Sequence, residues 1–479
     1  MPSSRITKSP RLIIATCVLF KDKTDNYLAE PPWGTLPKIA KNYSLLNSFD
    51  PQSWYQASSP TQIERPRLSG DRHTDVCVIG AGLTGLSAAI ALRDLGLNVV
   101  VLEAKTIGYG ASGRNGGHVG IGQRRGQLIL ERWLGLEHAK ALWQLGLEAV
   151  DLVSELICRF EIECELKTGN LFASANPKLT ADLQREVDHL HSVYDYSGAR
   201  YLSPQELQQE TEAQGLIDGV LDANAKHLHP LKYVHGLATA AETLGCEIYE
   251  HTQVNRIQQD SDTVKIYAEH GAVCANKVVL ACNAYIDQLE PRLTSKIMPI
   301  NNYMIATEPL SEELARSITR SDLAIADSQF VVNYWKLSAD KRLLFGGGET
   351  YSRRFPDNIK AFVRPHLLSR YPQLTQTQIT HGWGGTLAIT RNRLPNVGHI
   401  KQQVYYAQGF SGHGISIGTL AGKLMAEAIV GQGDGFEQLC RIPIKSFPGG
   451  PLLRWSTLVA GMLFYSLKDK LSPKVRSLV

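Results

Sequence analysis

The sequence predicts a mixed α/β (α+β) fold, in which a parallel sheet covered by helices is joined to an antiparallel sheet. The parallel sheet follows from one βαβ unit, with an apolar strand at 75–79 (DVCVI), a helix at 83–95 and a second apolar strand at 98–103. Two strands joined through a helix run parallel, because the crossover returns the chain to the same end of the sheet. The antiparallel sheet follows from separated strand-like runs, which span residues 298–307, 330–337 and 342–347.

The remaining elements follow in chain order from periodicity and turn signals. Helices are predicted within 124–160 and at 204–209, 231–244 and 414–430. Further strands are predicted at 169–173, 274–282 and 404–407. Residues 26–70, which are rich in Pro, Ser, Asn and Gln, predict an extended arm.

Composition excludes several classes of protein. With 479 residues, of which 43% are hydrophobic and 20% charged, the chain is expected to be globular and to form two or three domains. The net charge of +4 arises from 50 basic and 46 acidic side chains without a basic block, so no nucleic-acid partner is expected. Eight cysteines include no CxxC pair and no zinc-like spacing, which predicts no metal site and a reducing, cytoplasmic location.

A glycine-rich turn joins the first strand to the first helix. Gly80, Gly82 and Gly85 form a GxGxxG pattern, and Glu103 ends the next strand. In dinucleotide-binding folds the first glycine allows the tight turn, the second lets the backbone approach the pyrophosphate, and the third lets helix and sheet pack closely. The acid about 20 residues later binds ribose hydroxyls. Because strand, turn, helix and acid coincide, the segment predicts a dinucleotide site.

Two further glycine-rich segments favour FAD over NAD. Residues 108–117 (GYGASGRNGG) form a long loop after the second strand, which an NAD enzyme does not need but which suits an extended FAD. Residues 408–415 (QGFSGHGI) precede a helix whose N-terminus can stabilise negative charge on a reduced flavin. His413 in this segment can donate a hydrogen bond to the flavin or serve only as a structural donor.

Five segments together resemble the D-amino-acid-oxidase-type FAD oxidoreductases: DVCVIGAGLTGLSAAIALRDLG, IGYGASGRNGG, VVLACNAY, WGGTLAITRNRLPNVG and QGFSGHGISIGTLAGKLMAEAI. The resemblance implies a discontinuous Rossmann-like FAD-binding domain of the glutathione-reductase type and an antiparallel-sheet substrate-binding domain. The FAD-binding domain would comprise residues 71–125, 215–290 and 381–435, and the substrate-binding domain residues 126–214 and 291–380. Residues 1–70 would form an N-terminal extension, and residues 436–479 a C-terminal tail with an apolar helix.

The resemblance also assigns the residues that would contact FAD. They lie in the GxGxxG turn, after the second strand, in the glycine-rich loop and before the last helix. They are Gly80, Gly82, Leu83, Thr84, Gly85, Glu103, Ala104, Ser112, Arg114, Asn115, Gly116, Gly117, His118, Val254, Gly412, His413, Gly414 and Ile415. Val254 would reach the adenine, and residues 412–415 the flavin ring. Noncovalent FAD is the expectation, with attachment through His118 as the alternative.

A reaction follows from the same resemblance. Such enzymes transfer hydride from an amine-bearing carbon to flavin N5 and release an imine that water hydrolyses. Two segments, SWYQASSP (53–60) and IPIKSFPGG (442–450), are similar to the branch of the family that oxidises gamma-glutamylputrescine. This branch implies an N-acylated diamine as the amine substrate, with an aldehyde, ammonia and H2O2 as products.

The electron acceptor stays open between molecular oxygen and another acceptor. An FAD-dependent amino-acid or secondary-amine dehydrogenase or oxidase that passes electrons to a carrier or quinone is one alternative. A nonenzymatic flavoprotein is the second alternative.

Four aromatic residues are candidates for the wall of the substrate pocket, because aromatic faces can hold an amine chain and a transient cation. They are Tyr303, Tyr334, Trp335 and Trp383. The candidate catalytic residues are His413, Trp383 and Tyr334.

Leu387 bears on the choice of substrate. Aligned on Thr390, it lies where glycine oxidase and related enzymes place an arginine for the carboxylate beside the reacting carbon. Leucine cannot form that charge-assisted pair, so small amino acids are expected to be poor substrates. Arg391 and Arg393 follow closely and could supply the charge instead. Asn392 stands where the family has aspartate in its T-x-D-x-x-P stretch.

Each end of the chain carries an apolar run. Residues 12–20 are far shorter than the ~20 residues that span a membrane. No small-x-small cleavage site follows them, so an unstructured leader or a misplaced start codon is expected rather than a signal peptide. Residues 452–467 predict a helix docked on the protein, with contact to a membrane surface as the alternative.

Overall fold

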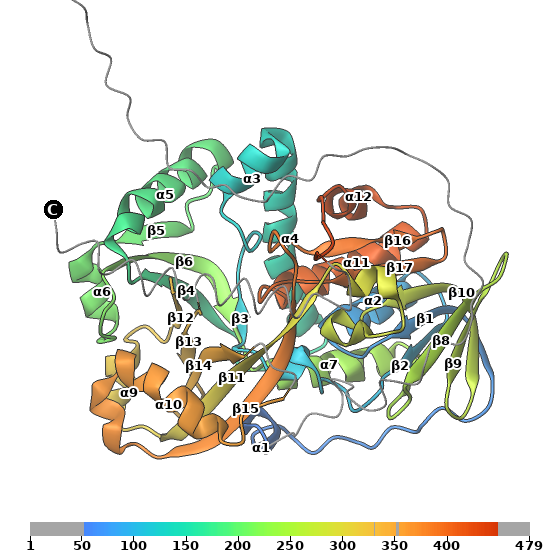
Figure 1. The fold of residues 1–479 in the computed structure, drawn as a ribbon, viewed down its shortest axis with the longest axis horizontal. Coiled ribbons are helices and arrows are strands. Elements are labelled where there is room, and N and C mark those ends of the chain that lie inside the picture. The colour runs from blue at the N-terminus through green and yellow to red at the C-terminus, as the bar shows by residue number, and fades with distance from the viewer. Residues whose placement is uncertain (1–51, 330, 351–353, 449–479) are drawn as a thin grey trace, which may run out of the picture. The chain divides into compact units, whose positions relative to one another are not determined.

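The computed structural model of the protein describes residues 52–329, 331–350 and 354–448. Within these ranges an eight-stranded and a nine-stranded sheet form the framework of the fold. Figure 1 shows the second sheet beside the first, with helices on the outer side of both. The predicted mixed α/β class is thus confirmed.

The first sheet is parallel at its centre. Its strand order is β16-β17-β10-β1-β2-β7, and the five strands from β17 to β7 run parallel. These are β17 (Val404–Gln408), β10 (Ala272–Leu280), β1 (Arg72–Ile79), β2 (Val99–Leu102) and β7 (Glu247–Tyr249). Three antiparallel strands complete the sheet: β16 (Asn396–Ile400), β8 (Val254–Gln259) and β9 (Val264–Ala268). The carboxyl ends of β1, β2 and β10 therefore meet at one edge, where sheets of this kind bind ligands.

Helices bury one face of this sheet. They are α2 (Leu83–Asp94), α3 (Gln127–Leu134), α4 (Leu136–Arg159), α7 (Pro230–Thr243), α11 (Ser416–Ile429) and α12 (Asp434–Cys440). Helices α2 and α11 approach so closely that a Cβ on Gly422 would lie 2.3 Å from the carbonyl oxygen of Thr84. The largest hydrophobic cluster fills the space between these helices and the strands. Because α2 packs closely on α11, the two glycine-rich segments that lead into these helices lie in one region.

The second sheet is mostly antiparallel, with one parallel pair between β12 and β4. Its order is β15-β11-β14-β13-β12-β4-β6-β3, and β5 pairs with β6. The strands are β3 (His118–Val119), β4 (Lys167–Ser174), β5 (Ala199–Leu202), β6 (Asp218–His227), β11 (Met298–Pro309), β12 (Ala324–Asp327), β13 (Tyr334–Leu337), β14 (Arg342–Thr350) and β15 (Ile379–Ile389). Helices on its outer side include α5 (Thr180–Tyr194), α6 (Pro204–Glu210), α9 (Glu312–Ile318) and α10 (Ile359–Arg370).

Helix α10 is fixed to this sheet by a buried ion pair. The Arg370 guanidinium donates to the carboxylate of Asp327 at 2.8 Å, and both side chains are almost fully buried. Asn333 donates to the same carboxylate at 2.7 Å. Because both charged groups are hydrogen-bonded, the pair fixes the position of α10 without leaving an unpaired buried charge.

Sheet membership does not follow the predicted domain boundaries everywhere. Strands β6 and β15 lie in segments predicted for the FAD-binding domain, yet both hydrogen-bond in the second sheet. Strand β6 contains few apolar residues (DGVLDANAKH), so its sequence gives little periodic signal. Strand β15 contains three glycines, which predict a loop, but antiparallel pairing with β11 extends through all of them.

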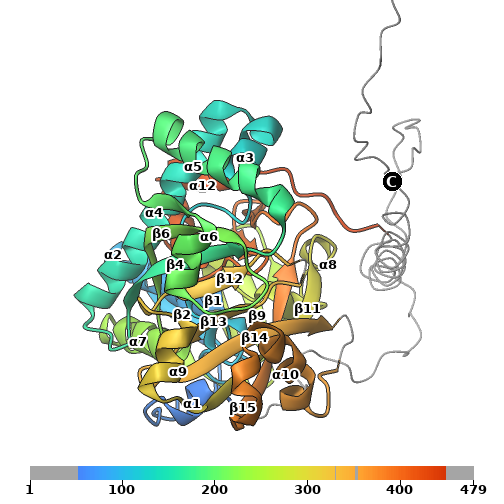
Figure 2. The same ribbon diagram turned by 90° about the vertical axis from the view of Figure 1, so that its left-hand side faces the viewer.

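The described part of the predicted arm is ordered by a short helix, α1 (Trp54–Ala57). Ser53 and Gln56 form a capping box at its start, with hydrogen bonds of 3.1 Å and 2.8 Å. Figures 1 and 2 both show α1 beside β15, where the Tyr55 ring packs against Trp383 at 5.2 Å. Helix α8 (Pro291–Thr294) is equally short.

Several predictions concern segments outside the described ranges. The apolar runs at 12–20 and 452–467 both lie there, as does most of the arm. In the ranges that the structure describes, no helix is both long and apolar enough to cross a membrane.

Candidate functional site

The turn from β1 into α2 forms the base of the site. Gly80 has a φ of +105°, and a Cβ there would lie 2.8 Å from the carbonyl oxygen of Ala281, so a side chain is excluded. Gly82 is the N-cap of α2 and provides no side-chain cap. The Leu83 amide donates instead to the Ser112 hydroxyl at 3.1 Å. The turn thus brings bare backbone against the glycine-rich loop, as the GxGxxG pattern predicts.

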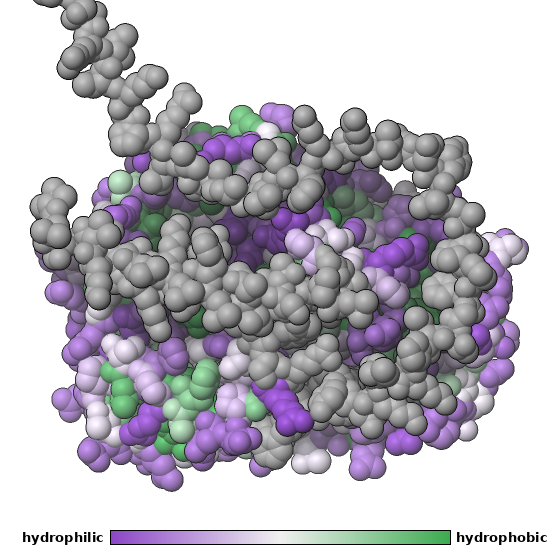
Figure 3. Space-filling view, viewed as in Figure 1, coloured by the Kyte–Doolittle hydropathy of each residue, from purple (hydrophilic) through white to green (hydrophobic). Residues whose placement is uncertain are grey.

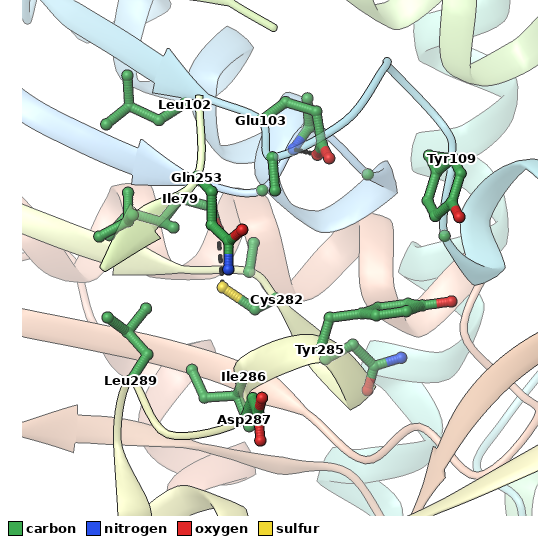
Figure 4. A pocket seen from close by; sticks show the side chains of 18 of the residues that line it. Ile79, Leu102, Glu103, Tyr109, Gln253, Cys282, Tyr285, Ile286, Asp287 and Leu289 are labelled. Atoms are coloured by element: carbon green, nitrogen blue, oxygen red, sulfur yellow. Dashed lines mark hydrogen bonds between the residues drawn. The ribbon is translucent and has the colours of Figure 1, made fainter. Parts of the chain in front are cut away.

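A cavity of about 260 Å³ opens beside this turn, at the carboxyl edge of the first sheet. Gly80, Gly82, Glu103, Ser112 and Val254 from the predicted set all line it. Figure 4 shows Glu103 and Tyr109 on one side and Tyr285, Ile286 and Leu289 on another. The structure therefore brings together residues that are 174 positions apart, from Gly80 to Val254, around one space.

Glu103 keeps its carboxylate oriented through backbone hydrogen bonds. Its two oxygens accept from the Ala81 amide at 2.8 Å and from the Lys105 amide at 3.0 Å. Burial raises the pKa of this carboxyl group, and the backbone amides oppose the rise. Each carboxylate oxygen has a second acceptor site, so Glu103 can still accept from hydroxyl groups in the cavity.

The wall opposite Glu103 comes from the segment after β10, which the sequence analysis did not single out as a site. Cys282, Asn283, Tyr285, Asp287 and Leu289 line the cavity from there. The available signal was the buried strand predicted at 274–282, because side chains beyond the carboxyl ends of adjacent parallel strands face the same crevice. That this strand lies next to β1 is shown by the structure alone. Burial raises the pKa of the Cys282 thiol to about 12, so this cysteine is not a thiolate nucleophile.

The glycine-rich loop at 108–117 is stabilised by its own polar side chains. Asn115 donates to the carbonyl oxygens of Ala111 and Ser112 at 3.0 Å and 2.8 Å, and accepts from the Gly117 amide at 2.8 Å. The Arg114 guanidinium donates to the carbonyl oxygen of Tyr109 and lies over the Tyr109 ring. In the structure these two predicted FAD contacts therefore fix the shape of the loop.

Trp383 supports the same loop from the second sheet. Its side chain is fully buried, and its indole Nε1 donates to the carbonyl oxygen of Arg114 at 3.1 Å. It packs in an apolar cluster with Tyr55, Leu231 and Met304. Trp383 accordingly positions the loop backbone.

The second glycine-rich segment contacts residues 120–122 through His413. The His413 Nε2 lies 3.1 Å from the carbonyl oxygen of Gly122, and a Cβ on Gly120 would lie 2.5 Å from the ring. Because a carbonyl oxygen only accepts, Nε2 carries the proton here. Burial lowers the pKa of His413 to about 4, so the ring is neutral near pH 7 and Nδ1 is bare. Of the two roles predicted for His413, the geometry favours that of a structural donor.

Helix α11 begins directly after this segment. Its N-cap, Ile415, makes no side-chain cap hydrogen bond, and its first turn carries no acidic residue. Its first helical residue, Ser416, donates from its hydroxyl to the carbonyl oxygen of Gly120 at 2.8 Å. The Gly418 amide donates to the carbonyl oxygen of Gly414, and the amides of Ser416 and Ile417 before it are available to an electronegative group.

Tyr334 and His118 face each other near the end of the glycine-rich loop. Their rings are 5.9 Å apart and perpendicular, and the Tyr334 hydroxyl donates to the Asn302 side chain at 2.5 Å. The Nε2 atom of His118 is buried without a hydrogen-bond partner in the described ranges. Burial lowers the pKa of His118 to about 3, with further lowering from Lys336 and His413. A buried imidazole nitrogen without a partner is suited to a ligand atom.

Two of the predicted aromatic pocket residues lie elsewhere. Trp335 stacks on Phe345 at 5.5 Å, and Tyr303 belongs to the same cluster under α10. Successive residues of a strand point to opposite faces, so Tyr334 and Trp335 cannot share one pocket. Tyr303 and Trp335 are core residues of the second sheet.

The predicted substrate-selecting stretch lies on β15 and in the turn after it. Leu387 packs beside a small apolar cluster of Met298, Ile300 and Ile389, so this position offers no charge. Asn392 stabilises the turn, because its side chain accepts from the Leu394 amide at 3.2 Å and donates to the carbonyl oxygen of Pro443 at 3.0 Å.

No group of three or more His, Cys, Asp or Glu side chains in the described ranges is arranged to hold a metal ion. The seven cysteines described there are free thiols.

Comparison with known proteins identifies relatives of this chain. The model of the family "DAO: FAD dependent oxidoreductase" matches residues 75–428. The gamma-glutamylputrescine oxidoreductase of Escherichia coli (strain K12) is 36% identical over 420 residues, which are 88% of this chain and 98% of that protein.

Two solved structures share the fold. L-proline dehydrogenase from P. horikoshii superimposes with a TM-score of 0.64 at 20% identity, over 77% of this chain and 96% of that one. Glycine oxidase from Geobacillus kaustophilus does so with a TM-score of 0.64 at 21% identity, over 76% of this chain and 96% of that one.

Proposed function

This chain belongs to the DAO family of FAD-dependent oxidoreductases, and we propose that it deaminates the primary amine of gamma-glutamylputrescine or a similar N-acylated diamine by oxidation. The products would be an aldehyde, ammonia and, with molecular oxygen as the acceptor, H2O2. The 36% identity to an enzyme of that name over 88% of the chain supports the substrate class.

The residues of the site fit FAD. A Cβ on Gly82 would lie 2.6 Å from the Ser112 hydroxyl, so the turn packs against the glycine-rich loop only because it has no side chain, as a turn that holds a pyrophosphate requires. We assign the pyrophosphate to residues 80–85, the ribose hydroxyls to Glu103 and the adenine to Val254. Residues 412–415 and His118 are assigned to the flavin. FAD, when bound, accepts the two electrons and the hydrogen that leave the amine-bearing carbon.

The chain's own residues would mainly orient the substrate and exclude water. Neutral His413 fixes the 120–122 segment against the start of α11 through the Gly122 carbonyl oxygen. Burial raises the pKa of the Tyr334 hydroxyl, so it stays protonated and donates to Asn302. The amine would thus be surrounded by the protonated phenol of Tyr334 and the neutral imidazoles of His118 and His413. The proposed reaction assigns none of these described groups a covalent bond to the substrate.

The apolar setting of Leu387 is the observation that carries the choice of an amine over an amino acid. A carboxylate beside the reacting carbon would meet Leu387 and its apolar neighbours Ile300 and Ile389. Burying that carboxylate unpaired would cost on the order of several kcal/mol. An N-acylated diamine has no charge at that position and avoids the cost.

The test compares kcat/KM for gamma-glutamylputrescine with the values for glycine, sarcosine and D-alanine. We expect the diamine derivative to be preferred by at least about tenfold. A higher kcat/KM for any of the three amino acids would show that the amine assignment is wrong. Oxygen uptake without an added acceptor separates an oxidase from a dehydrogenase that passes electrons to a carrier or quinone.

A further inference from the structure

Three arginines from two separate segments lie close to one another. Arg124 and Arg125 lie in the loop between β3 and α3, and Arg393 lies in the turn between β15 and β16. The Arg125 Nε donates to the carbonyl oxygen of Asn392 at 3.2 Å, which joins the two segments next to Arg393. Figure 1 shows these segments, in teal and in orange, between α4 and the second sheet.

The cluster has an excess of positive charge. The side chains of Arg124 and Arg393 make no hydrogen bond or ion pair with any residue in the described ranges. Arg125 adds only a cation–π contact with Trp133 at 5.8 Å to its bond with the Asn392 carbonyl oxygen. Glu349 is the one acidic side chain that raises the pKa of Arg124 among the groups described. A single carboxylate near three guanidinium groups leaves the cluster cationic.

Arg124 is exposed and at the same time crowded by other groups. Its side chain reaches solvent, yet burial lowers its pKa, and the charges of Arg393 and Arg125 lower it further. Figure 3 shows that the visible surface of this face is largely hydrophilic.

Arg124 lies next to the predicted flavin site. Arg124 follows Gly122 by two residues, and the Gly122 carbonyl oxygen accepts from His413. The charge of Arg124 also lowers the pKa of His413. On the other side, the charge of Glu349 raises the pKa of Tyr334. Arg124 is therefore within electrostatic reach of His413, and Glu349, which interacts with Arg124, is within electrostatic reach of Tyr334.

We propose that Arg124, Arg125 and Arg393 bind the carboxylate at the far end of the substrate, away from the carbon that is oxidised. The proposal rests on the proposed function and specifies the substrate further: the acyl group of the diamine carries a carboxylate, as a gamma-glutamyl group does. Guanidinium groups bind carboxylates through paired, charge-assisted hydrogen bonds. Bringing three like charges together disfavours the free site and favours the site with an anion bound. The apolar Leu387 and the cationic cluster then select together for a remote carboxylate.

The decisive experiment compares a substrate that carries the remote carboxylate with one that does not. Gamma-glutamylputrescine carries it, and N-acetylputrescine has the same reacting amine and amide but lacks the carboxylate and the α-amino group of the glutamyl end, so the arginine variants isolate the contribution of the carboxylate. In wild-type holoenzyme we expect the first to have a kcat/KM at least about tenfold higher, mainly through KM. Arg124→Gln and Arg393→Gln should each lower kcat/KM for gamma-glutamylputrescine by about 10- to 100-fold, the effect of losing one charge-assisted hydrogen bond. For N-acetylputrescine they should lower it by no more than about threefold.

Two further variants make the comparison specific. Arg124→Lys, which keeps the charge but loses the paired geometry, should recover part of the lost preference. Arg256→Gln is the matched control. Arg256 lies over the Tyr267 ring on the β8–β9 hairpin of the first sheet, outside the two segments that carry the cluster. It should leave both substrates unaffected. FAD content and Tm of each variant separate loss of fold from loss of recognition.

Equal losses for both substrates, or no preference in the wild-type enzyme, would overturn the proposal. If neither substrate is oxidised, the proposed function fails, and binding then tests the cluster separately. Gamma-glutamyl-n-butylamide, which lacks the reacting amine, is titrated into holoenzyme and followed by flavin absorbance. A Kd at least tenfold weaker in Arg124→Gln than in wild type supports the cluster. Absence of binding, or equal Kd values, overturns it.

Discussion

Replacing Gly82 by valine should remove FAD while leaving the fold intact. Gly82 is the N-cap of α2 with an ordinary φ of −91°, so valine causes no backbone strain there. Its Cβ would lie 2.6 Å from the Ser112 hydroxyl, which must rotate away and lose its bond to the Leu83 amide. One neutral hydrogen bond contributes about 0.5–1.5 kcal/mol to stability. The apoprotein should therefore be destabilised by no more than about that amount.

FAD binding should be affected far more than stability. The branched side chain would occupy the approach to the α2 amides, and each charge-assisted bond to phosphate contributes about 1.5–3 kcal/mol. Losing one such bond weakens binding by about 10- to 150-fold before any steric clash is counted. The assay measures FAD content by flavin absorbance, Kd by fluorescence quenching and Tm with and without added FAD.

Gly433→Val is the matched control for this variant. Gly433 is also a helix N-cap with negative φ, and a Cβ there would meet nothing nearer than 3.8 Å. It should bind FAD like wild type. Full FAD occupancy in Gly82→Val, or a comparable loss in Gly433→Val, would refute the assignment of the pyrophosphate to this turn.

Further predictions concern the electron donor, pH and the glycine-rich loop. NADH should not reduce the flavin, because the GxGxxG turn between β1 and α2 is assigned to FAD and no second GxGxxG directly follows a strand; rapid bleaching by NADH in a stopped-flow experiment would contradict this. Burial lowers the pKa of His227 to about 3 and of His235 and His413 to about 4, below the ~6.5 of an unfolded histidine. The unfolded chain therefore binds more protons than the folded chain between these values. The free energy of unfolding should fall by up to about 1.4 kcal/mol per pH unit for each histidine as pH drops from about 6.5 to 4, and Tm should fall with it. A His227→Gln variant should show a shallower fall, and an unchanged slope would argue against a buried neutral His227. Trp383→Phe leaves the Arg114 carbonyl oxygen without its donor and should cost about 1–3 kcal/mol in urea unfolding. It should also weaken FAD binding, and an unchanged Kd would show that Trp383 does not position the loop.

The local signals in the sequence predicted the cofactor half of the molecule well. The βαβ unit was expected at 75–103, and the structure has β1, α2 and β2 there, with Glu103 directly after β2. The signal is strong because strand, turn and helix are adjacent in the chain and each glycine has one steric reason to be present. The opposite wall of the cavity, around Tyr285, could not be read in the same way. It approaches Glu103 only because β10 pairs with β1, which is a non-local property of the sheet.

The substrate half was predicted less completely for the same reason. Tyr303, Tyr334 and Trp335 all look alike in the sequence, but strand alternation places Tyr334 beside His118 and the other two under α10. The register of β11 on β15 and β14 decides this, and side chains alone do not specify it. The arginine cluster likewise joins two segments separated by more than 260 residues through the Arg125 bond to the Asn392 carbonyl oxygen.

The most direct test of the account is anaerobic mixing of the purified holoenzyme with gamma-glutamylputrescine. Each active site should be reduced by one equivalent of the amine, and the flavin absorbance should bleach in a single saturable phase. Admission of oxygen should then restore the oxidised spectrum if oxygen is the acceptor. Equimolar glycine, sarcosine and D-alanine should bleach it at least about tenfold more slowly at subsaturating concentration. Faster bleaching by an amino acid, or none with any amine, would contradict the account.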